Sequence, residues 1–376
     1  MKQNPIRIAH IMGKWLGGGV EAVVMNYYRH IDRTKIQFDF ICDNDSTNIP
    51  YDEIKSLGGK VILIPPYQKV FQYQKQLKKV LREGNYQIVH SHINALSVFP
   101  LKAAKDAGIA NRIAHSHSTT NKVEWKKNLL KNVLKPFSKV YATHYFACTE
   151  HAGRWLFGDE TFDKGEVFIL NNAIDISKFK YNPEIRAQKR AELEISDDTL
   201  VIGHIGRFVQ QKNHYYVIDV FNEVHKMNQN SILVLIGQGP LQVEIENKVK
   251  ELGLVKSVKF LGQREDVHEW YQAFDIFLFP SIYEGLGMVA VEAQCAGCYC
   301  LASTKVPSVA KVTDNIEFLE LDSKISDWVS KILKQVGIPR VVGIEEGVSN
   351  KGYDINKESF FLVDIYEGML YYSISK

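Results

Sequence analysis

Short hydrophobic runs rich in β-branched and aromatic residues alternate with longer segments of helical periodicity along the whole chain. Each run has the length of a strand, and the segments between runs have the pattern of crossover helices. This alternation predicts an α/β protein with a Rossmann-like parallel sheet in each half. The runs lie at 6–12, 38–42, 60–65, 87–92, 112–117, 145–149 and 166–170, and then at 200–206, 231–237, 258–262, 274–280 and 298–303.

The length of 376 residues is that of two domains. The polar, turn-forming stretch NNAIDISKFKYNP lies between the two sets of runs and is suited to a linker. We therefore predict domains at 1–175 and 176–355, with a last helix at 356–376. Ligands of open parallel sheets lie beyond the carboxyl ends of the strands, so two sheets that face each other would bind a ligand in the cleft between them.

Composition excludes several classes of protein. The chain is 45% hydrophobic and 24% charged, which is typical of a globular protein. No apolar run approaches the roughly 20 residues that span a bilayer, and the five cysteines have no framework spacing. We expect a cytoplasmic protein, with packing rather than metal binding for the CAGC segment that holds Cys295 and Cys298.

The net charge of +3 is unevenly distributed. Residues 1–175 carry 24 Lys and Arg against 16 Asp and Glu, whereas residues 176–376 carry 22 against 27. The first half should therefore attract an anionic partner. Nucleic acid is not expected, because no helix-turn-helix, zinc finger or RNA-binding aromatic signature is present.

A glycine-rich loop follows the first strand. Gly17, Gly18 and Gly19 allow a ligand close to the backbone, and the helix that starts near Val20 offers free amides to a phosphate. A flexible turn is the alternative. The G-x-G-x-x-G fingerprint of NAD enzymes is absent, although Asp43 follows the second strand where an acidic ribose ligand would lie.

Two further patterns in the first half raise the question of a metal. Asp43 and Asp45 resemble the Asp-x-Asp of metal-dependent glycosyltransferases, but such residues are also common in turns. HSHIN and HSHST supply two His-x-His pairs on separate strands, without the spacing of zinc ligands. We expect one histidine of each pair to face the sheet and the other, His92 or His117, to lie at the strand tip.

The loops of the second half combine cations and glycines. Arg207 and Lys212, after Gly206, can converge on one anion such as a diphosphate, without a metal. Gly237 and Gly239 again allow close approach of a ligand to the backbone. Leu261 to Arg264 offers an edge for a flat base.

The stretch PSIYEGLGMVAVE places Glu284 and Glu292 on either side of a helix start. We expect Glu284 to accept hydroxyl groups of a sugar and Glu292, one turn into the helix, to bind two ribose hydroxyls. The amides between them suit phosphates. These amides belong to the turn and first helical residues, which are Gly285, Leu286, Gly287, Met288 and Val289.

The chain resembles the GT-B retaining glycosyltransferases of family four, most closely the bacterial capsule and exopolysaccharide branch. The motifs that carry the resemblance are, in chain order, GGGVE, HSHST, GRFVQQK, GQGP, FLGQREDV and PSIYEGLGMVAVE. The resemblance covers nearly the whole chain. It implies two Rossmann-like domains across a cleft, with the acceptor on the first, the nucleotide sugar on the second and the last helix packed back on the first. One departure is Ala173 in NNAID, where the family has glycine.

The resemblance also implies roles for single residues. Arg207 and Lys212 would bind the diphosphate, Glu284 the donor sugar and Glu292 the ribose. Gly18 would contact the phosphate from the first domain, with Gly19 beside it, and His117 would lie beside the transferred sugar. The residues expected to be catalytic are His117, Glu284, Arg207 and Lys212.

A basic amphipathic element spans NKVEWKKNLLKNVLKPF. Its lysines could form a solvated helix face, or they could contact anionic lipid at the inner face of the cell membrane. The charge of the first half favours the lipid contact, which would suit a lipid-linked acceptor. The contact residues would be Lys126, Lys127, Lys131 and Lys135.

The sequence as a whole predicts a metal-independent retaining glycosyltransferase for surface polysaccharide synthesis. A UDP-sugar would be the donor substrate and UDP the product, with no cofactor. The alternatives are a nucleotide-sugar 2-epimerase, a non-catalytic nucleotide-sugar-binding protein and an NAD oxidoreductase. The sugar and the acceptor are not identified by the residues.

Overall fold

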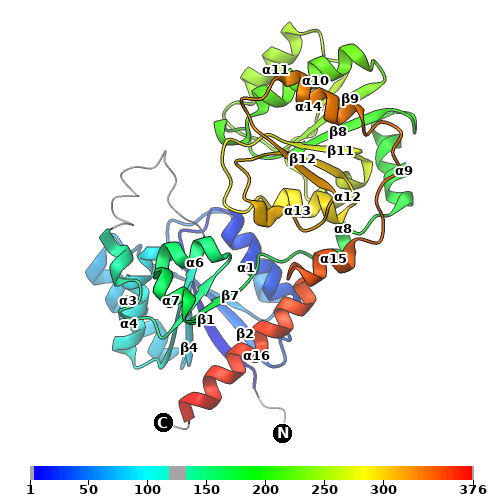
Figure 1. Cartoon of the computed structure of the whole chain (residues 1–376). Coiled ribbons are helices and arrows are strands. Elements are labelled where there is room, and N and C mark those ends of the chain that lie inside the picture. The colour runs from blue at the N-terminus through cyan, green and yellow to red at the C-terminus, as the bar shows by residue number, and fades with distance from the viewer. Residues whose placement is uncertain (1–3, 118–132, 375–376) are drawn as a thin grey trace. The chain divides into compact units, whose positions relative to one another are not determined.

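The computed structural model describes residues 4–117 and 133–374. The chain divides into two compact units, coloured by residue number in Figure 1. Unit 1 contains Met1–Ile174 and Gly352–Lys376, and unit 2 contains Asp175–Lys351. Unit 1 is therefore built from two segments that are far apart in sequence.

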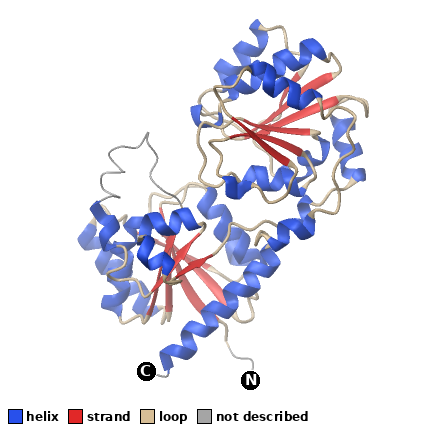
Figure 2. Ribbon diagram, viewed as in Figure 1, coloured by secondary structure: helices blue, strands red, loops and turns tan. Residues whose placement is uncertain are grey.

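Unit 1 contains a seven-stranded parallel sheet with the order β3-β2-β1-β4-β5-β6-β7. Helices flank the strands on both faces (Figure 2). The strands are β1 (Ile6–Gly13), β2 (Ile36–Asp43), β3 (Lys60–Ile64), β4 (Ile88–Ser91), β5 (Asn111–Ser116), β6 (His144–Ala147) and β7 (Val167–Ile169). The helices are α1 (Gly19–His30), α2 (Tyr51–Ser56), α3 (Val70–Glu83), α4 (Val98–Ala107), α6 (Glu150–Phe157), α7 (Asp159–Asp163) and α16 (Ile355–Ile374), with short 3₁₀ turns η1 (Asn94–Ser97) and η2 (Lys135–Phe137).

The C-terminal helix α16 completes one face of the unit 1 sheet. It packs beside α1 (Figure 1), and Leu362, Val363 and Tyr366 join the core that also holds Phe38. The chain enters α16 through a parallel bridge between Ile174 and Asp354. The prediction that the last helix returns to the first domain is confirmed.

Unit 2 contains a six-stranded parallel sheet with the order β10-β9-β8-β11-β12-β13. Its edge strand β13 was not predicted from the sequence. The strands are β8 (Leu200–Ile205), β9 (Ser231–Ile236), β10 (Val258–Phe260), β11 (Ile276–Phe279), β12 (Tyr299–Ser303) and β13 (Ile316–Leu319). The helices are α8 (Ile176–Phe179), α9 (Pro183–Glu192), α10 (His214–Met227), α11 (Gln242–Glu251), α12 (Val267–Ala273), α13 (Met288–Cys295), α14 (Ile325–Leu333) and α15 (Glu345–Asn350), with 3₁₀ turns η3 (Gln210–Lys212) and η4 (Ser308–Ala310).

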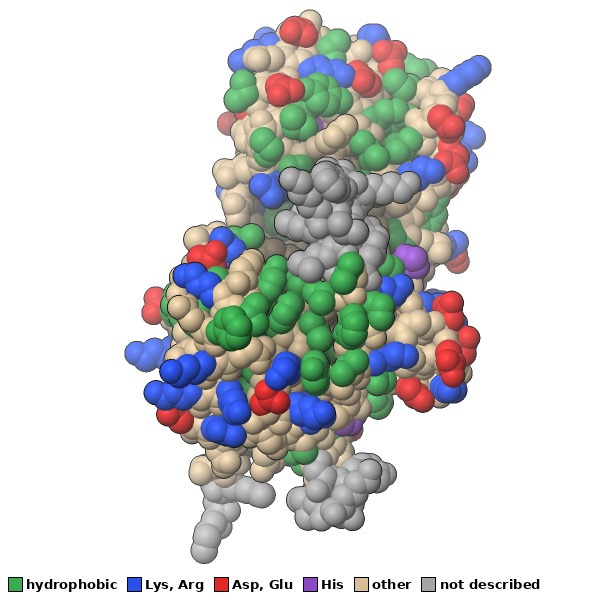
Figure 3. All heavy atoms as spheres, turned by 90° about the vertical axis from the view of Figure 1, so that its left-hand side faces the viewer, with side chains coloured by type: hydrophobic (Ala, Val, Ile, Leu, Met, Phe, Trp, Pro, Cys, Tyr) green, Lys and Arg blue, Asp and Glu red, His purple; other side chains and the backbone are tan. Residues whose placement is uncertain are grey.

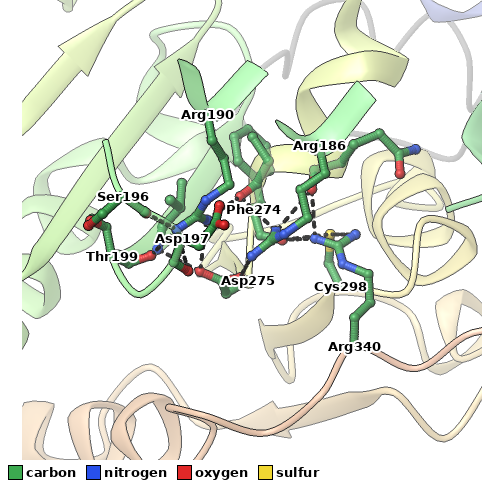
Figure 4. A network of polar contacts seen from close by, with 12 residues as sticks. Arg186, Arg190, Ser196, Asp197, Thr199, Phe274, Asp275, Cys298 and Arg340 are labelled. Carbon is green, nitrogen blue, oxygen red and sulfur yellow. Dashed lines mark hydrogen bonds and ion pairs between the residues drawn. The ribbon is translucent and has the colours of Figure 1, made fainter. Parts of the chain in front are cut away.

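Three arginines hold together the end of the unit 2 sheet where the strands begin (Figure 4). Arg186 donates to Asp275 at 2.6 Å, and the buried Arg190 donates to the carbonyl of Ser196 at 2.8 Å. The last carbonyls of a helix lack partners within the helix. Here Arg186, Arg190 and Arg340 supply the missing donors to the carbonyls that end α12 and follow it, which are those of Tyr271, Gln272, Ala273 and Phe274. This network is structural and lies at the end of the sheet opposite the carboxyl ends of the strands.

Across residues 4–117 and 133–374, the structure contains no helix that is both long enough and apolar enough to cross a bilayer.

Candidate functional site

Two loops at the carboxyl end of the unit 2 sheet are joined to each other. The amide of Ile282 donates to the carbonyl of Gln211 at 2.8 Å, and the Gln211 side chain donates to the carbonyl of Tyr283 at 3.0 Å. The Asn213 side chain donates to the carbonyl of Pro280 at 3.1 Å. These bonds fix the loop after β8 against the loop after β11, so that side chains from both meet.

Lys212 and Glu284 meet in this joint as an ion pair. Lys212 Nζ lies 2.6 Å from Glu284 Oε1 and 5.0 Å from the centre of the Phe279 ring. The two side chains are 17% and 8% exposed. The aliphatic part of Lys212 lies close to Gly206, where an added Cβ would be 3.1 Å from Lys212 Cγ and Cδ. The sequence predicts both residues as ligand contacts, but it does not predict that each is the partner of the other.

Helix α13 begins at Met288, four residues after Glu284. Gly287 caps the helix with a φ of 81°, and a Cβ there would lie 3.1 Å from both Phe279 and Val306, so glycine is required. The first amides of α13, at Met288 and Val289, have no acceptor within the helix and lie at its positive dipole end. These N–H donors therefore follow Glu284 by four and five residues, at the end of the same turn.

Glu292 lies one turn into α13 and accepts a hydrogen bond of 2.8 Å from the Tyr271 hydroxyl. Burial raises the pKa of Glu292, against the Tyr271 hydrogen bond and the positive charge of Lys212, which lower it. Tyr271 is fully buried, and burial followed by the charge of Glu292 raises its pKa well above the ordinary value. The carboxylate is thus oriented by a fixed donor and feels the charge of Lys212.

Other predicted contacts of unit 2 have different surroundings. Arg207 is exposed, and within the described part of the chain its side chain makes no hydrogen bond or ion pair. Gly237, at φ 136°, and Gly239 pack against neighbouring backbone, since an added Cβ would lie 2.1 Å from the Gly206 carbonyl oxygen and 2.4 Å from that of Phe208. In the structure these two glycines allow the backbone of the adjacent loop, at Gly206 and Phe208, to pack against them.

Arg264 is held by its own turn. It donates to both oxygens of Asp266, at 2.8 and 2.7 Å, and lies 5.6 Å from the Trp270 ring. Asp266 is also paired with the buried Lys189 at 2.9 Å. Arg264 is therefore positioned by ion pairing and by an aromatic neighbour.

The glycine-rich loop of unit 1 leads into α1. Gly18 is the N-cap residue, and Glu21 in the first turn accepts a hydrogen bond of 3.0 Å from the Leu16 amide. A Cβ on Gly18 would lie 3.1 Å from Glu21, whereas a Cβ on Gly19 would meet nothing within 4 Å. The loop thus has open space at Gly19 next to the positive end of α1.

Asp43 and Asp45 do not form a matched pair of free carboxylates. Asp43 is buried, and burial, followed by the charge of Asp45, raises its pKa to about 6. Asp45 is exposed and pairs with Lys14 at 2.7 Å. A divalent ion bound by the Asp-x-Asp pattern would therefore have to displace Lys14 from Asp45.

The histidines of unit 1 meet one another, which their sequence pattern does not indicate. We expected His92 and His117 to lie at the strand tips, and each directly follows its strand, since β4 ends at Ser91 and β5 at Ser116. All four are buried, and β4 and β5 are adjacent, so the pairs meet: His90 contacts His115 at 3.0 Å and His92 contacts His117 at 2.8 Å. A fifth residue, His10 on β1, joins them and was missed, because a single histidine in a hydrophobic run gives no signal of its own.

Comparison with known proteins identifies the chain. The model described as "Glycosyltransferase Family 4" matches residues 17–178, and "Glycosyl transferases group 1" matches residues 185–335. A Bacillus subtilis protein with the provisional name glycosyltransferase EpsF is 33% identical over 374 residues, which cover 97% of each chain. The chain belongs to the GT-B glycosyltransferases.

Further relatives and solved structures agree with this glycosyltransferase assignment. The capsular polysaccharide biosynthesis glycosyltransferase CapH of Staphylococcus aureus is 24% identical and covers 96% of this chain and 98% of its own. An Escherichia coli UDP-Gal:alpha-D-GlcNAc-diphosphoundecaprenol alpha-1,3-galactosyltransferase is 23% identical, with 98% of both chains covered. The crystal structure of Anabaena HepE in complex with UDP and glucose matches with a TM-score of 0.75 and 17% identity, over 96% of this chain and 100% of that one, and supports the fold.

The predicted membrane contacts of this glycosyltransferase fall mostly outside the described residues. Lys126, Lys127 and Lys131 lie in the gap at 118–132. Lys135 begins η2 and lies 5.6 Å from the Trp155 ring.

Proposed function

We propose that this glycosyltransferase is a retaining, metal-independent enzyme that transfers a sugar from a UDP-sugar to a hydroxyl of a glycan or lipid-linked acceptor. The observation that carries the proposal is the Lys212–Glu284 pair, 2.6 Å apart, with Glu284 in the turn that leads into α13. The pair joins a cation to a carboxylate that can accept hydrogen bonds from hydroxyls, and the first amides of α13 follow Glu284 by four and five residues. An activated sugar with a diphosphate requires groups of these three kinds. The printed names of CapH and the Escherichia coli galactosyltransferase support surface polysaccharide synthesis, and the HepE complexes support UDP.

The proposed mechanism uses groups that the chain itself supplies. Lys212 and the amides of Met288 and Val289 stabilise the negative charge of the departing diphosphate, with the exposed Arg207 free to add a second cation. Glu284 accepts hydrogen bonds from hydroxyls of the donor sugar, and Glu292, oriented by Tyr271, accepts those of the ribose. Fixed positive groups that act where charge develops lower the barrier without a metal ion.

The residues assigned to unit 1 complete the proposal. Gly18 and Gly19 offer backbone amides at the start of α1 to the phosphates. His117 is assigned to the transferred sugar. The oxygen of the acceptor hydroxyl bonds to the anomeric carbon from the side on which the diphosphate leaves, its proton passes to the departing diphosphate, and the α linkage of the donor is retained.

A nucleotide-release assay tests this function. We expect release of UDP from a UDP-sugar only when a lipid-linked or glycan acceptor is present, at a rate that EDTA does not change. UDP release without an acceptor would favour the 2-epimerase, and binding of UDP without turnover would favour a non-catalytic binding protein. Loss of activity with EDTA, restored by added Mg²⁺ or Mn²⁺, would contradict metal independence.

We also propose a peripheral contact of unit 1 with anionic lipid. The described residues that follow the gap expose Val133, Phe137 and Val140 by 57%, 52% and 55%, and Figure 3 shows hydrophobic side chains gathered with lysines and arginines on one face of this unit. Exposed apolar side chains together with basic ones are typical of surfaces that bind membranes.

Vesicles that contain anionic lipid should pellet the protein at low salt, and less so at high salt. Each surface lysine contributes about 1 kcal/mol, so the change of Lys126, Lys127, Lys131 and Lys135 together to Ala should abolish pelleting. The control changes four exposed lysines of unit 2 to Ala and should pellet as the unmodified protein does. These are Lys250, Lys256, Lys311 and Lys334. Equal pelleting of both variants would contradict the contact.

A further inference from the structure

Five buried histidines and one tyrosine of unit 1 form two hydrogen-bonded chains. In the first, His10 Nδ1 lies 2.9 Å from His92 Nε2, and His92 Nδ1 lies 2.8 Å from His117 Nε2. In the second, the Tyr366 hydroxyl lies 2.7 Å from His90 Nδ1, and His90 Nε2 lies 3.0 Å from His115 Nδ1. The two chains stack, with His115 and His117 ring centres 3.8 Å apart. The first chain ends at His117, the residue assigned to the transferred sugar.

The histidines of the first chain are neutral. Burial lowers the pKa of His10 and of His117 to about 3, and it lowers that of His92 well below the ordinary value. Within the described residues, no carboxylate bonds to any of the three rings that could stabilise an imidazolium. A neutral imidazole has one N–H donor and one bare nitrogen acceptor, so each ring must donate on one side and accept on the other.

The buried end of the chain decides its direction. His10 Nε2 is buried without a partner, and the ring lies 3.9 Å from that of Phe38. An orphaned buried N–H is rarer than an under-satisfied acceptor, so the proton of His10 belongs on Nδ1. His10 then donates to His92 Nε2, His92 must carry its proton on Nδ1 and donate to His117 Nε2, and the proton of His117 is left on Nδ1.

The same histidines also offer two overlapping triads that could surround a metal ion, His10 with His90 and His92, and His92 with His115 and His117. The two chains of hydrogen bonds explain the closeness of these nitrogens better than a metal site does. Their nitrogens already pair with one another, and a divalent charge among buried neutral rings without a carboxylate would be costly.

The backbone of His117 is fixed as firmly as its ring. Its amide donates to Asn94 Oδ1 at 2.7 Å, and its carbonyl accepts from the Cys148 thiol at 3.4 Å. Within the part of the chain that the structure describes, His117 Nδ1 makes no hydrogen bond. Among the described residues, Nδ1 is therefore the ring nitrogen of His117 that remains without a partner.

We propose that His92, held in turn by His10, is a positioning residue that fixes His117 in the tautomer with Nδ1–H free, so that His117 acts as a neutral hydrogen-bond donor to an oxygen of the transferred sugar. This inference rests on the proposed function of His117. It also excludes a role as general base, because the bare nitrogen of His117 is the one occupied by His92. The oxygen that His117 contacts is a hydroxyl, ring or glycosidic oxygen, each of which can accept a hydrogen bond.

Nitrogen-15 NMR of the full-length protein tests the tautomer directly. Histidine labelled at both ring nitrogens, with the His117 signals assigned by their loss in His117→Gln, should show a proton on Nδ1 and a bare Nε2 from pH 5.5 to 8. A proton on Nε2, a rapid exchange between tautomers, or an imidazolium near neutral pH would overturn the proposal. This readout needs no turnover, so it stands or fails separately from the assay of UDP release.

Variants of His92 test the positioning. His92→Phe removes the donor to His117 and should reduce kcat by about 10 to 100-fold with little change in KM, because a loosely held catalytic group is misplaced by a fraction of an ångström or more. His92→Asn retains an N–H near the position of Nδ1 and should recover most of the loss. Equal kcat values for the Phe and Asn variants would contradict the role.

His115→Phe is the matched control. His115 is also buried, lies near the end of β5 two residues before His117 and stacks on it, but it belongs to the other hydrogen-bonded chain. The control should share any loss of stability. It should leave the His117 tautomer unchanged and keep kcat within about twofold of the unmodified protein. A change of the His117 tautomer in the control would show that packing alone sets it, and would overturn the proposal.

Discussion

Lys212→Ala is expected to reduce kcat by about a thousandfold. Removal of one preorganised donor to a developing negative charge lowers kcat by roughly 10²–10³-fold, and the Glu284 carboxylate left behind lowers it further. Without Lys212, the Glu284 carboxylate, which is 8% exposed, lacks its cation and repels the diphosphate. Glu284→Ala should lower kcat by a similar factor. It removes the carboxylate that accepts hydrogen bonds from hydroxyls of the donor sugar, and it leaves Lys212 unpaired. Measurement of UDP release under saturating donor and acceptor checks both.

Unit 2 supplies a matched control for Lys212. Lys248 Nζ lies 2.6 Å from Asp219 and 5.4 Å from the centre of the Tyr215 ring, which closely repeats the contacts of Lys212. Lys248→Ala should therefore cost a similar ion pair and leave kcat unchanged. Normal turnover in Lys212→Ala, or an equal loss in Lys248→Ala, would remove the basis for the proposed site.

The second large effect is a loss of stability of unit 1 in mild acid. Burial lowers the pKa of His10, His90, His92, His115 and His117 below the ordinary value of 6.5. Below pH 6.5 the unfolded chain binds protons at these residues, whereas the folded chain does not bind them until the pH is far lower. The free energy of unfolding therefore falls as the pH falls through 6.5, by up to ~1.4 kcal/mol per histidine and pH unit.

Two carboxyl groups of unit 1 act in the opposite direction. Burial raises the pKa of Asp43 to about 6 and that of Glu358 to about 7, so the folded state binds protons first and gains stability as the pH falls. Five histidines outweigh two carboxyls, and we expect a net loss of roughly 4 kcal/mol from pH 7 to 5.5. That is a large share of the stability of an ordinary domain, about 5–15 kcal/mol.

Hydrogen exchange measured strand by strand at pH 7 and 5.5, corrected for intrinsic exchange rates, checks this expectation in the intact protein. Protection should fall more for β1, β4 and β5 than for the strands of unit 2, which holds two strongly shifted histidines, His204 and His214. In His10→Phe the free energy of unfolding should fall less steeply with falling pH, by the contribution of about one histidine. Protection of unit 1 that is independent of pH over this range would contradict the burial of neutral histidines.

The sequence was sufficient to predict most of the architecture, and it singled out both members of the ion pair in the candidate site. Hydrophobic runs predicted every strand except β13, whose short edge segment Ile316–Leu319 is only half-buried and lacks a continuous apolar pattern. Lys212 and Glu284 were both predicted as contacts from local motifs. Their pairing was not, because 72 residues separate them and only the adjacency of β8 and β11 brings their loops together.

The histidine chains show the same limit more strongly. Each His-x-His pair is visible in the sequence, but the contact between the pairs follows from the strand order β1-β4-β5, in which His10 and His90 lie opposite each other. Residues such as Gln211 and Tyr271, which orient the loop and Glu292, also carry no motif of their own. Position in the strand order, rather than residue type, determines their roles.

The return of α16 to unit 1 determines the order in which the protein can be completed during translation. The ribosome finishes all of unit 2 before it makes Tyr366, the residue that contacts His90 and closes one face of the unit 1 core. A nascent chain therefore carries unit 1 with an uncovered apolar face for the time needed to synthesise about 200 further residues, roughly 10 to 40 s at about 5–20 residues per second. The unit encoded first is the last to become complete.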